Sequence, residues 1–496
     1  MANLKSLMKD TAIYGISSIA ARFINYLLVP IETFAWAAKG GQYGIITNVY
    51  SYIAILIVLL TFGMETTFFR YANKEGENAR MVYSTVLRMV GAVALAFALI
   101  ILAFLKPIAG FMGYAEHPWY IGAMALCVAV DAWSCIMFDY LRYLHRPIKF
   151  MILKVANIFI NVVMVAMLLL VLPALHIYIP GLYNANGVPD VGIVFYVNLL
   201  CSVVTLLLLW KEARGITAGF DWKLCRRMFS YTWPMLILGI AGQLNQSASQ
   251  ILFPYLYDGA ASEAKAQLGI YGGCIKIAMI MVIITQAFRF AYEPFVFGNK
   301  DADKKQTYAK VMKFYVMFTL LAYLCVIAYM DILRHVVAPD YWEGLKVVPI
   351  TMAAEIMFGV YFNLSFWYKL TDRTIWGAYF SGLGCLVLIL TDVIFIPHYS
   401  YMACAWAGFA AYGISMVASY FFGQKYYPIN YPIKDIMIYV VLAVLVFAGM
   451  TCSNQLLPSG WALVGNTLLL LAFVAYMVKK DIPLASLPVI GKHFKK

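Results

Sequence analysis

The stretch "YGIITNVYSYIAILIVLLTFGM", residues 43–64, decides the fold because it contains no charged side chain. An α-helix of about 20 apolar residues crosses the ~30 Å hydrocarbon core of a bilayer. Similar runs recur along the 496-residue chain, which is 63% hydrophobic and 12% charged, whereas soluble proteins carry about twice that charge. A transmembrane β-barrel would show alternating segments of ~10 residues instead. The sequence therefore predicts an all-α polytopic membrane protein.

The apolar runs predict fourteen transmembrane helices, with both termini cytoplasmic. The predicted spans are 11–31, 43–64, 82–105, 119–140, 150–172, 191–210, 229–256, 268–296, 314–330, 347–368, 375–396, 402–422, 435–451 and 460–478. In this topology, 27 of the 37 Lys and Arg residues are cytoplasmic, 5 are external and 5 lie within spans, as the positive-inside rule requires. Topology thus explains the net charge of +13, and we expect no nucleic-acid partner.

The spans predict two six-helix lobes followed by two extra helices. The longest basic internal segment, "KEARGITAGFDWKLCRRMF", separates spans six and seven and is expected to be a cytoplasmic amphipathic connector. Aligning span one with span seven pairs Arg22 with Gln243 and predicts a parallel repeat. The expected parts are an N-terminal lobe at 1–210, a connector at 211–228, a C-terminal lobe at 229–422, and two helices with a basic tail at 423–496.

Span seven begins as a membrane helix and then fills with amides, in "SYTWPMLILGIAGQLNQSASQ" at residues 230–250. Gln243, Gln246 and Gln250 fall at positions i, i+3 and i+7, on one face of a helix. Hydrocarbon offers amides no hydrogen-bond partner. The face therefore either borders a water-filled cavity between the lobes or joins neighbouring helices through interhelical hydrogen bonds.

Five cations fall within predicted spans, where each costs roughly 2.5–3.5 kcal/mol at the centre of an isolated helix. Lys154 lies one turn from the cytoplasmic end, so its ammonium is expected to reach the interface. Arg88 and Arg289 lie about two turns from that end, so they reach the interface or line a cavity. Arg22 lies ~16 Å into span one, so we expect it to line a cavity, with a buried ion pair as the alternative. Lys276 is also a candidate for cavity lining.

Three carboxylates within spans are candidates for binding a coupling H+ or Na+: Asp131, Glu355 and Asp392. Asp131 could instead pair with Arg22 or another cation. Because cations outnumber these carboxylates, the cavity favours an anionic cargo, and the amides of span seven suit the hydroxyls of a sugar. The candidate substrate-binding residues are Arg22, Lys276, Arg88, Arg289, Gln243, Gln246 and Gln250.

The sequence predicts a transporter without a cofactor, metal site or catalytic residues. The nine cysteines are scattered without a C-x-x-C pair, and no histidines form H-E-x-x-H. No segment matches the phosphate-binding loop G-x-x-x-x-G-K-[ST]. The driving force is therefore expected to be an ion gradient, the membrane potential or consumption of the product outside.

Several stretches resemble the polysaccharide-transporter (Wzx-like) flippases of the multidrug/oligosaccharidyl-lipid/polysaccharide exporter superfamily. They are "GQYGIITNVYSY", "FGMETTFFRY", "LRYLHRPIKF", "MFSYTWPML", "YWEGLKVVPI", "GVYFNLSFWYKLTDRTIWGAYFSG" and "YYPINYP", and they cover roughly residues 5–435. The resemblance implies two six-helix lobes around a central cavity that opens alternately to each side. A basic residue in span one is a family feature, which Arg22 supplies. One departure is "IPHYSYMACAWAG", where the family often has IP-x-YG-x-x-GAA; Ala403 and Ala405 can still keep the helices close.

The resemblance also implies the cargo and its setting. The cargo would be an undecaprenyl-diphosphate-linked oligosaccharide, moved from the inner to the outer leaflet of the bacterial cytoplasmic (inner) membrane for O-antigen, capsule or exopolysaccharide assembly. Membrane lipid and the polymerase and glycosyltransferases of the same pathway would be partners. In the lipid II flippase branch two extra helices line a groove for the lipid tail, a role open to spans thirteen and fourteen here.

Two other classes of function stay open from the sequence. A multidrug or organic-cation antiporter of the same superfamily is kept open by Asp131, although span one carries Arg22 where such antiporters bury carboxylates. A membrane-embedded polymerase or acyltransferase is the other. Those enzymes need a large external loop or an intramembrane acid/base cluster, and His176 with Asp190 in the largest external segment does not make a catalytic set.

Overall fold

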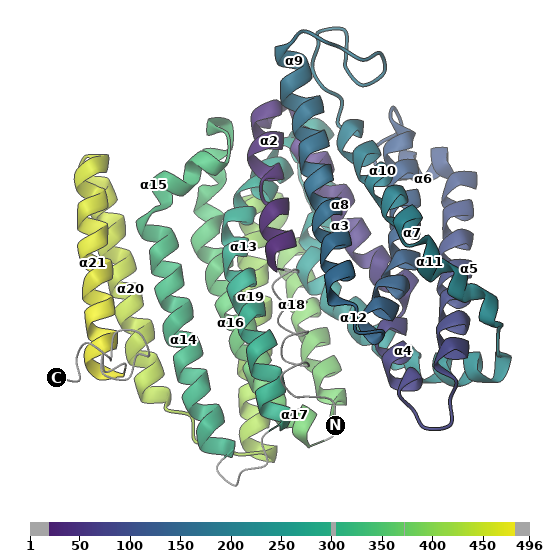
Figure 1. Cartoon of the computed structure of the whole chain (residues 1–496). Helices are drawn as coiled ribbons and strands as arrows, with labels where there is room; N and C mark the ends of the chain where they lie inside the picture. Colours follow the sequence, from purple (N-terminus) through teal and green to yellow (C-terminus); the bar gives the residue numbers. More distant parts are fainter. Residues whose placement is uncertain (1–18, 299–303, 372, 482–496) are drawn as a thin grey trace. The chain divides into compact units, whose positions relative to one another are not determined.

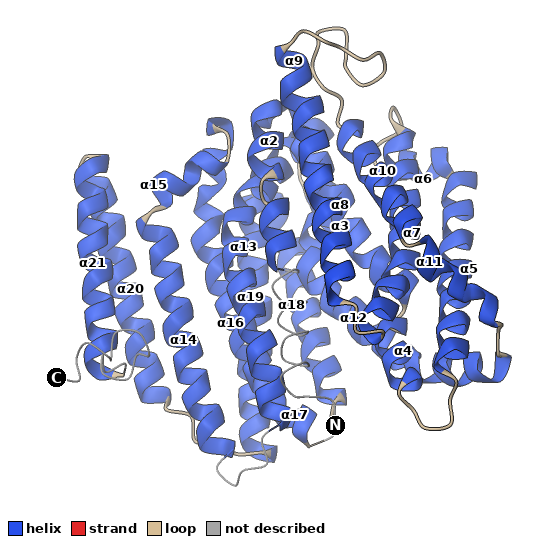
Figure 2. Ribbon diagram, in the orientation of Figure 1, coloured by secondary structure: helices blue, strands red, loops and turns tan. Residues whose placement is uncertain are grey.

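The computed structural model describes residues 19–298, 304–371 and 373–481 (Figure 1). These residues form helices joined by loops, and Figure 2 shows no strand among them. The expected all-α, multi-pass membrane fold is confirmed. Within the described residues, isolated β-bridges occur in the loop between α9 and α10, formed by Pro180, Tyr183 and Pro189.

Residues 19–25 are helical and precede a turn at Tyr26 and Leu27. The helices that follow, in chain order, are α2 (Leu28–Ala35), η1 (Ala38–Gly40), α3 (Gln42–Thr61), α4 (Met64–Ala72), α5 (Ala79–Ala103), α6 (Leu105–Phe111), α7 (Pro118–Tyr143), α8 (Pro147–Ala166), η2 (Met167–Val171), α9 (Leu172–Ala174), α10 (Gly192–Leu208), α11 (Trp210–Ala213), η3 (Arg214–Ala218), α12 (Trp222–Leu256), α13 (Ala261–Gly298), α14 (Lys304–Ala328), α15 (Met330–Leu333), η4 (Arg334–Val336), η5 (Pro339–Lys346), α16 (Val347–Leu364), α17 (Phe366–Leu370), α18 (Ile375–Tyr399), α19 (Tyr401–Tyr426), α20 (Ile433–Leu456) and α21 (Ser459–Lys480).

Eleven helices in the described ranges are long and apolar enough to cross a membrane, and a bent pair, Gly192–Leu208 with Trp210–Ala218, raises the number to twelve. The predicted span at 229–256 lies inside α12, whose 35 residues extend about 52 Å at ~1.5 Å per residue. Its amides make it less apolar than the other spans. The first predicted span, 11–31, begins outside the described residues. The total of fourteen and the cytoplasmic termini therefore stay predictions.

The chain forms two compact units, which we describe separately. The first comprises Met1–Gly273 and Ser381–Ala407, and the second Cys274–Phe380 and Gly408–Lys496. The predicted lobes at 1–210 and 229–422, the connector at 211–228 and the C-terminal part at 423–496 stay predictions.

The core of the first unit surrounds α7, which packs against α3, α5 and α10. Val86 and Leu87 of α5 and Ile136, Met137 and Leu141 of α7 are all fully buried there. Such large apolar side chains contribute about 1.5–3 kcal/mol each when removed from water. Because α7 contacts helices on several sides, apolar residues surround it rather than following a single stripe.

The helix breaks after α3, and the chain changes direction before α4 begins. Phe62 has φ 34° and Gly63 has φ 74°, both in the left-handed region, which glycine adopts without steric cost and phenylalanine does not. A Cβ on Gly63 would lie 3.3 Å from the Cβ of Met235 on α12. The break places α4 against α12, where the hydroxyl oxygens of Thr67 and Thr232 are 2.6 Å apart.

Glycine also allows α3 to touch the beginning of α13 backbone to backbone. A Cβ on Gly44 would lie 1.8 Å from the carbonyl oxygen of Lys265, and a Cβ on Gly269 would lie 2.9 Å from the nitrogen of Gly44. Small residues at such crossings let membrane helices approach closely.

The turn between α18 and α19 contains the family departure noted in the sequence. Ser400 stands where the family pattern has glycine, and its φ of 51° lies in the left-handed region. Ala403 and Ala405 are each only 2% exposed, so small residues do keep α19 tightly packed here. The serine therefore keeps the left-handed conformation of the turn, at a steric cost that glycine would not have.

In the second unit, α14 packs against α16, α20 and α21, and α20 pairs with α21 at the yellow end of Figure 1. The Lys313 ammonium on α14 lies 3.0 Å from Oδ2 of Asp435 and 2.6 Å from Oδ1 of Asp481. The Tyr439 hydroxyl donates to Oδ2 of Asp481 at 2.6 Å. These bonds attach the two extra C-terminal helices to α14.

The segment 211–228, for which the sequence predicts an amphipathic connector, contains most of α11, η3 and the first turns of α12. Two side chains of α5 hold it in place. The Tyr83 hydroxyl donates to the carbonyl of Glu212 at 3.0 Å, and the Ser84 hydroxyl donates to the carbonyl of Ile216 at 2.8 Å. The Asp221 side chain then caps α12 by accepting from the backbone of Lys223.

Candidate functional site

The amides of α12 divide into two groups. The Gln250 side-chain oxygen accepts a hydrogen bond from the Ser51 hydroxyl of α3. The Gln243 amide donates to Ser247 of its own helix at 3.0 Å and is half-buried, and Gln246 is exposed. Interhelical bonding is therefore found at Gln250, whereas the water-filled cavity expected beside Gln243 and Gln246 stays a prediction.

A polar seam surrounds Gln250 between α3 and α12. The Asn48 amide donates to the backbone carbonyl of Gln250 at 2.9 Å. The Tyr114 hydroxyl donates to Oδ1 of Asn48 at 2.9 Å. Burial raises the pKa of Tyr114, which lies between α6 and α7 outside the spans, so its hydroxyl stays protonated as the donor. The seam satisfies the polar groups that α3 and α12 would otherwise expose to hydrocarbon.

Arg22 lies in the helical stretch 19–25 and its residue is exposed. Across the described ranges it forms no ion pair, so the buried pair that the sequence left open is not found there. A guanidinium at membrane depth is stable only where water or a polar ligand reaches it. The role of Arg22 in substrate binding stays a prediction, and its exposure is compatible with that role.

Arg88 contacts the chain that precedes α12. Its Nε and Nη2 atoms donate to the carbonyl of Ile216 at 3.2 and 2.8 Å. This contact gives Arg88 a structural role that the sequence did not predict, and its binding role stays untested. The Lys154 residue is exposed, with its ammonium 4.6 Å from the ring centroid of Phe138.

Three of the predicted residues lie in the second unit. Lys276 and Arg289 are on α13 and are half-buried. The Arg289 guanidinium lies 4.1 Å from the ring centroid of Phe362, a cation–π contact that stabilises a charge away from bulk water. Glu355 on α16 has the phenol groups of Tyr315 and Tyr412 as neighbours.

Asp131 and Asp392, the two candidate ion-coupling acids of the first unit, have different surroundings. Asp131 accepts a weak bond from the Cys127 thiol at 3.6 Å, and the cation that acts on it electrostatically is Lys154 rather than Arg22. Asp392 is 0% exposed, and neither carboxylate oxygen has a hydrogen-bond partner of good geometry among the described residues. Ser249 lies beside it. A carboxylate in this environment is stable when a proton or a cation neutralises it.

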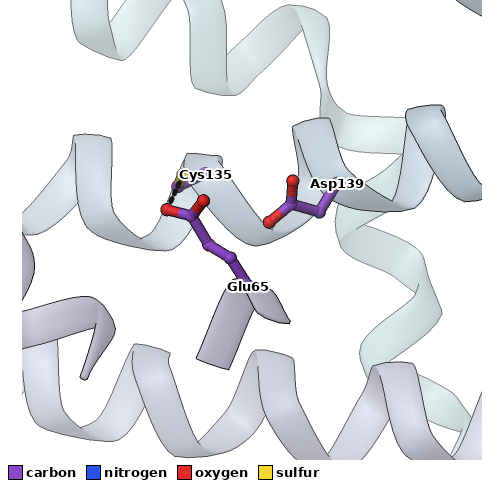
Figure 3. A group of neighbouring side chains, drawn as sticks. All are labelled: Glu65, Cys135 and Asp139. Atoms are coloured by element: carbon purple, nitrogen blue, oxygen red, sulfur yellow. Dashed lines mark hydrogen bonds between the residues drawn. The ribbon is translucent and has the colours of Figure 1, made fainter. Parts of the chain in front are cut away.

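The structure also brings together three residues that the sequence did not single out: Glu65 of α4, and Cys135 and Asp139 of α7 (Figure 3). One ligand atom from each lies within 4.8 Å of the others. The spacing of four residues between Cys135 and Asp139 predicts a shared helix face. The approach of α4 to α7 has no sequence signal, which is why Glu65 was missed.

An apolar groove of about 510 Å³ lies beside the amide helix, between α12 and α18 in the first unit. Its lining is Ile237, Ile240, Ala241, Leu244, Gly382, Cys385, Leu386 and Ile389. Helix α12 therefore presents amides on one face and lines an apolar groove with another.

The sequence matches a known protein family over more than half of its length. A family model described as "Polysaccharide biosynthesis protein" matches residues 40–346. The chain belongs to this family. A comparison with curated proteins found no match.

Solved structures show that this polysaccharide biosynthesis protein has the fold of the exporter superfamily that the sequence motifs indicated. The lipid II flippase MurJ in an inward closed conformation is 15% identical, with 95% of this chain and 100% of that chain covered and a TM-score of 0.68. An inward-facing multidrug resistance MATE family transporter of the MOP superfamily is 14% identical over 81% of this chain and 93% of its own, with a TM-score of 0.64. A MATE structure in complex with MaD5 is 13% identical over 84% and 95%, with a TM-score of 0.60.

These neighbours are a flippase and transporters rather than enzymes, as the sequence predicted for this family member. His176 and Asp190 lie in the segment between α9 and α10. His176 faces the Tyr178 hydroxyl, with 3.4 Å between Nδ1 and the oxygen, whereas Asp190 accepts from the Tyr120 hydroxyl at 2.5 Å. The histidine and the carboxylate therefore have different partners.

Proposed function

We propose that this protein is an alternating-access flippase. Its cargo is an undecaprenyl-diphosphate-linked oligosaccharide, moved from the inner to the outer leaflet of the bacterial inner membrane for O-antigen, capsule or exopolysaccharide assembly. Membership of the polysaccharide biosynthesis family and the fold shared with a lipid II flippase support this proposal. The observation that carries it is the exposed Arg22, which no acid pairs within the described chain.

The chemistry of the first unit suits an amphiphilic anion. Arg22 supplies a cation for a diphosphate, and Gln243 and Gln246 supply donors and acceptors for sugar hydroxyls. The apolar groove between α12 and α18 suits a hydrocarbon chain. An inside-negative potential favours outward movement of negative charge by about 2.3 kcal/mol per charge per 100 mV, less whatever moving cations offset.

The test is translocation of a fluorescent undecaprenyl-diphosphate glycan in liposomes that contain the full chain. A charge-assisted hydrogen bond contributes about 1.5–3 kcal/mol, so Arg22→Ala is expected to slow translocation about 10- to 150-fold. Arg22→Lys should retain part of the rate because it keeps the charge. The matched control is Arg226→Ala, another exposed arginine, with an expected wild-type rate. Full translocation by Arg22→Ala, with normal folding, would remove Arg22 from the mechanism.

The other parts of the proposed mechanism follow from the same site. Lys276, Arg88 and Arg289 are proposed to contribute further positive charge, and a coupling H+ or Na+ is proposed at Asp392, with Asp131 and Glu355 as the other candidates. Membrane lipid and the polymerase and glycosyltransferases of the pathway are the proposed partners.

A second candidate function is export of organic cations. The buried carboxylate of Asp392, the half-buried Asp131 and the fold shared with multidrug transporters favour it. Dye efflux that Asp131→Asn abolishes, in liposomes that show no glycolipid movement, would establish this function in place of the flippase.

A further inference from the structure

Two carboxylates of the first unit face each other at short range. Glu65 lies in the first turn of α4, and Cys135 and Asp139 lie one turn apart on α7. Figure 3 shows the Glu65 carboxylate directed toward the Cys135 thiol, with the Asp139 carboxylate extending toward Glu65. The Cys135 thiol donates to Oε1 of Glu65 at 2.9 Å. The group therefore consists of two acids and one weak neutral donor.

The Asp139 side chain indicates that the group holds a ligand. The residue is 3% exposed, and only its Oδ1 atom has a partner, the Arg142 guanidinium at 3.1 Å. Its Oδ2 atom has none among the residues described. Buried carboxylate oxygens almost always have a partner, and this one belongs to a side chain aimed at another acid.

The surrounding cations do not separate the two acids. Arg142, whose side chain is 45% exposed, binds Asp139 from the α7 side, and the exposed Lys154 acts on Asp139 and Cys135 from α8 with its ammonium over Phe138. Asp131 of α7 adds a further negative charge near Lys154. Four other cations on the neighbouring helices have partners elsewhere: Lys149 with Glu212, Arg227 with Glu77, Arg70 with Tyr231 and Arg88 with Ile216.

We propose that Glu65 and Asp139 form a proton-binding site that holds one proton on one of the two carboxylates, with the Cys135 thiol orienting Glu65. Two like charges within 4.8 Å disfavour double ionisation, and binding one proton relieves their repulsion. A proton fits this group better than a metal. Sodium prefers a shell of several oxygen ligands, and the thiol keeps its hydrogen for the bond to Glu65.

Helix α4 connects the proton-binding site to α12, whose Gln243 and Gln246 are proposed to bind the sugar of the cargo. This helix starts after the left-handed break at Phe62 and Gly63, and its Thr67 contacts Thr232 of α12. Loss of the shared proton leaves two adjacent negative charges that push α4 away from α7. Because α4 contacts α12, the helix that carries Gln243 and Gln246, proton release can move these two amide side chains. This regulatory role rests on the proposed function, whereas the proton site itself does not.

Infrared spectroscopy of the full chain in nanodiscs tests the site directly, because a protonated carboxyl has its own carbonyl band. We expect a band that is present at neutral pH and is lost as the pH is raised further. Glu65→Gln and Asp139→Asn should each change this same band, since the acid that remains no longer faces a second carboxylate, and the double variant should remove no more than this one band. Asp340→Asn, at an exposed acid, is the control and should leave it in place. Cys135→Ala should shift the band, which keeps the test valid where a carboxyl variant does not fold.

Several results would overturn the proposal. Separate, additive bands for the two acids, or no band from either acid at neutral pH, would show that they do not hold a common proton. Loss of the band when sodium replaces potassium, or its appearance only after a chelator removes zinc, would show that the site binds a metal ion instead. No substrate is needed, so the spectrum decides the proton site even where glycolipid flipping is not found. If flipping does occur, Glu65→Gln should lose the pH dependence of its rate, and Asp340→Asn, at an exposed acid outside the site, should keep it.

Discussion

Removing the Lys149 ammonium should destabilise the first unit, because it leaves the Glu212 carboxylate without its cation. The ammonium of Lys149 lies 2.7 Å from both carboxylate oxygens of Glu212. The Glu212 side chain is only 4% exposed, whereas that of Lys149 is 33% exposed. In Lys149→Met the side chain keeps a similar length and apolar stem, so the change is mainly electrostatic.

The size of the effect follows from this burial. Breaking a buried ion pair by removing one partner costs about 3–5 kcal/mol. Because Lys149 is partly exposed, water will reach the site and the lower end, about 3 kcal/mol, applies. For a cooperative unit of about 300 residues, an unfolding entropy of about 2.1 cal/mol/K per residue converts this loss into a Tm decrease of about 5 °C.

Thermal unfolding in detergent, followed by tryptophan fluorescence at one fixed scan rate, measures this decrease. Lys211→Met is the matched control, because Lys211 is exposed and precedes Glu212 by one residue, and its Tm should stay within about 1 °C of wild type. Adding Glu212→Gln to Lys149→Met should recover most of the loss, since the buried charge is then gone. An unchanged Tm in Lys149→Met, or no recovery in the double variant, would refute the reasoning.

Three further predictions concern the packing and polar contacts of the first unit. Gly44→Val should lower the Tm by at least about 2 °C, because the added side chain meets the Lys265 carbonyl. The control Gly242→Ala, at a glycine with open space around it, should not lower the Tm. Equal Tm values for the two variants would contradict the close approach of α3 and α13. Asn48→Leu should cost about 2 kcal/mol, since Tyr114 and the Gln250 carbonyl lose their partner, and unfolding measurements should show a smaller loss for Gln250→Leu. Asp392→Asn should raise the Tm by about 2–5 °C at pH 8 in sodium-free buffer, since it removes a buried charge without a partner; a lower Tm would show that the carboxylate is bound.

The sequence by itself determined the membrane fold and most of its helices. Hydrocarbon requires each crossing segment to be long, apolar and internally hydrogen-bonded, so the spans are visible without knowledge of their neighbours. The predicted span at 119–140 became α7 (Pro118–Tyr143), and the predicted span at 375–396 became α18 (Ile375–Tyr399). The amide face of span seven was visible for the same reason, because helical periodicity is a local property.

Only the tertiary structure decided which polar groups meet. Gln250 bonds Ser51, Arg88 bonds the carbonyl of Ile216, and Glu65 faces Asp139. Each of these contacts joins residues far apart in the chain, and the relative position of two helices depends on how their side chains pack rather than on either sequence alone. The same limit applied to Asp392, whose position in the chain gave no sign that its carboxylate would be fully buried. The hydrocarbon core of the bilayer thus determined where the helices lie in the sequence, and packing between the helices determined which polar side chains come into contact.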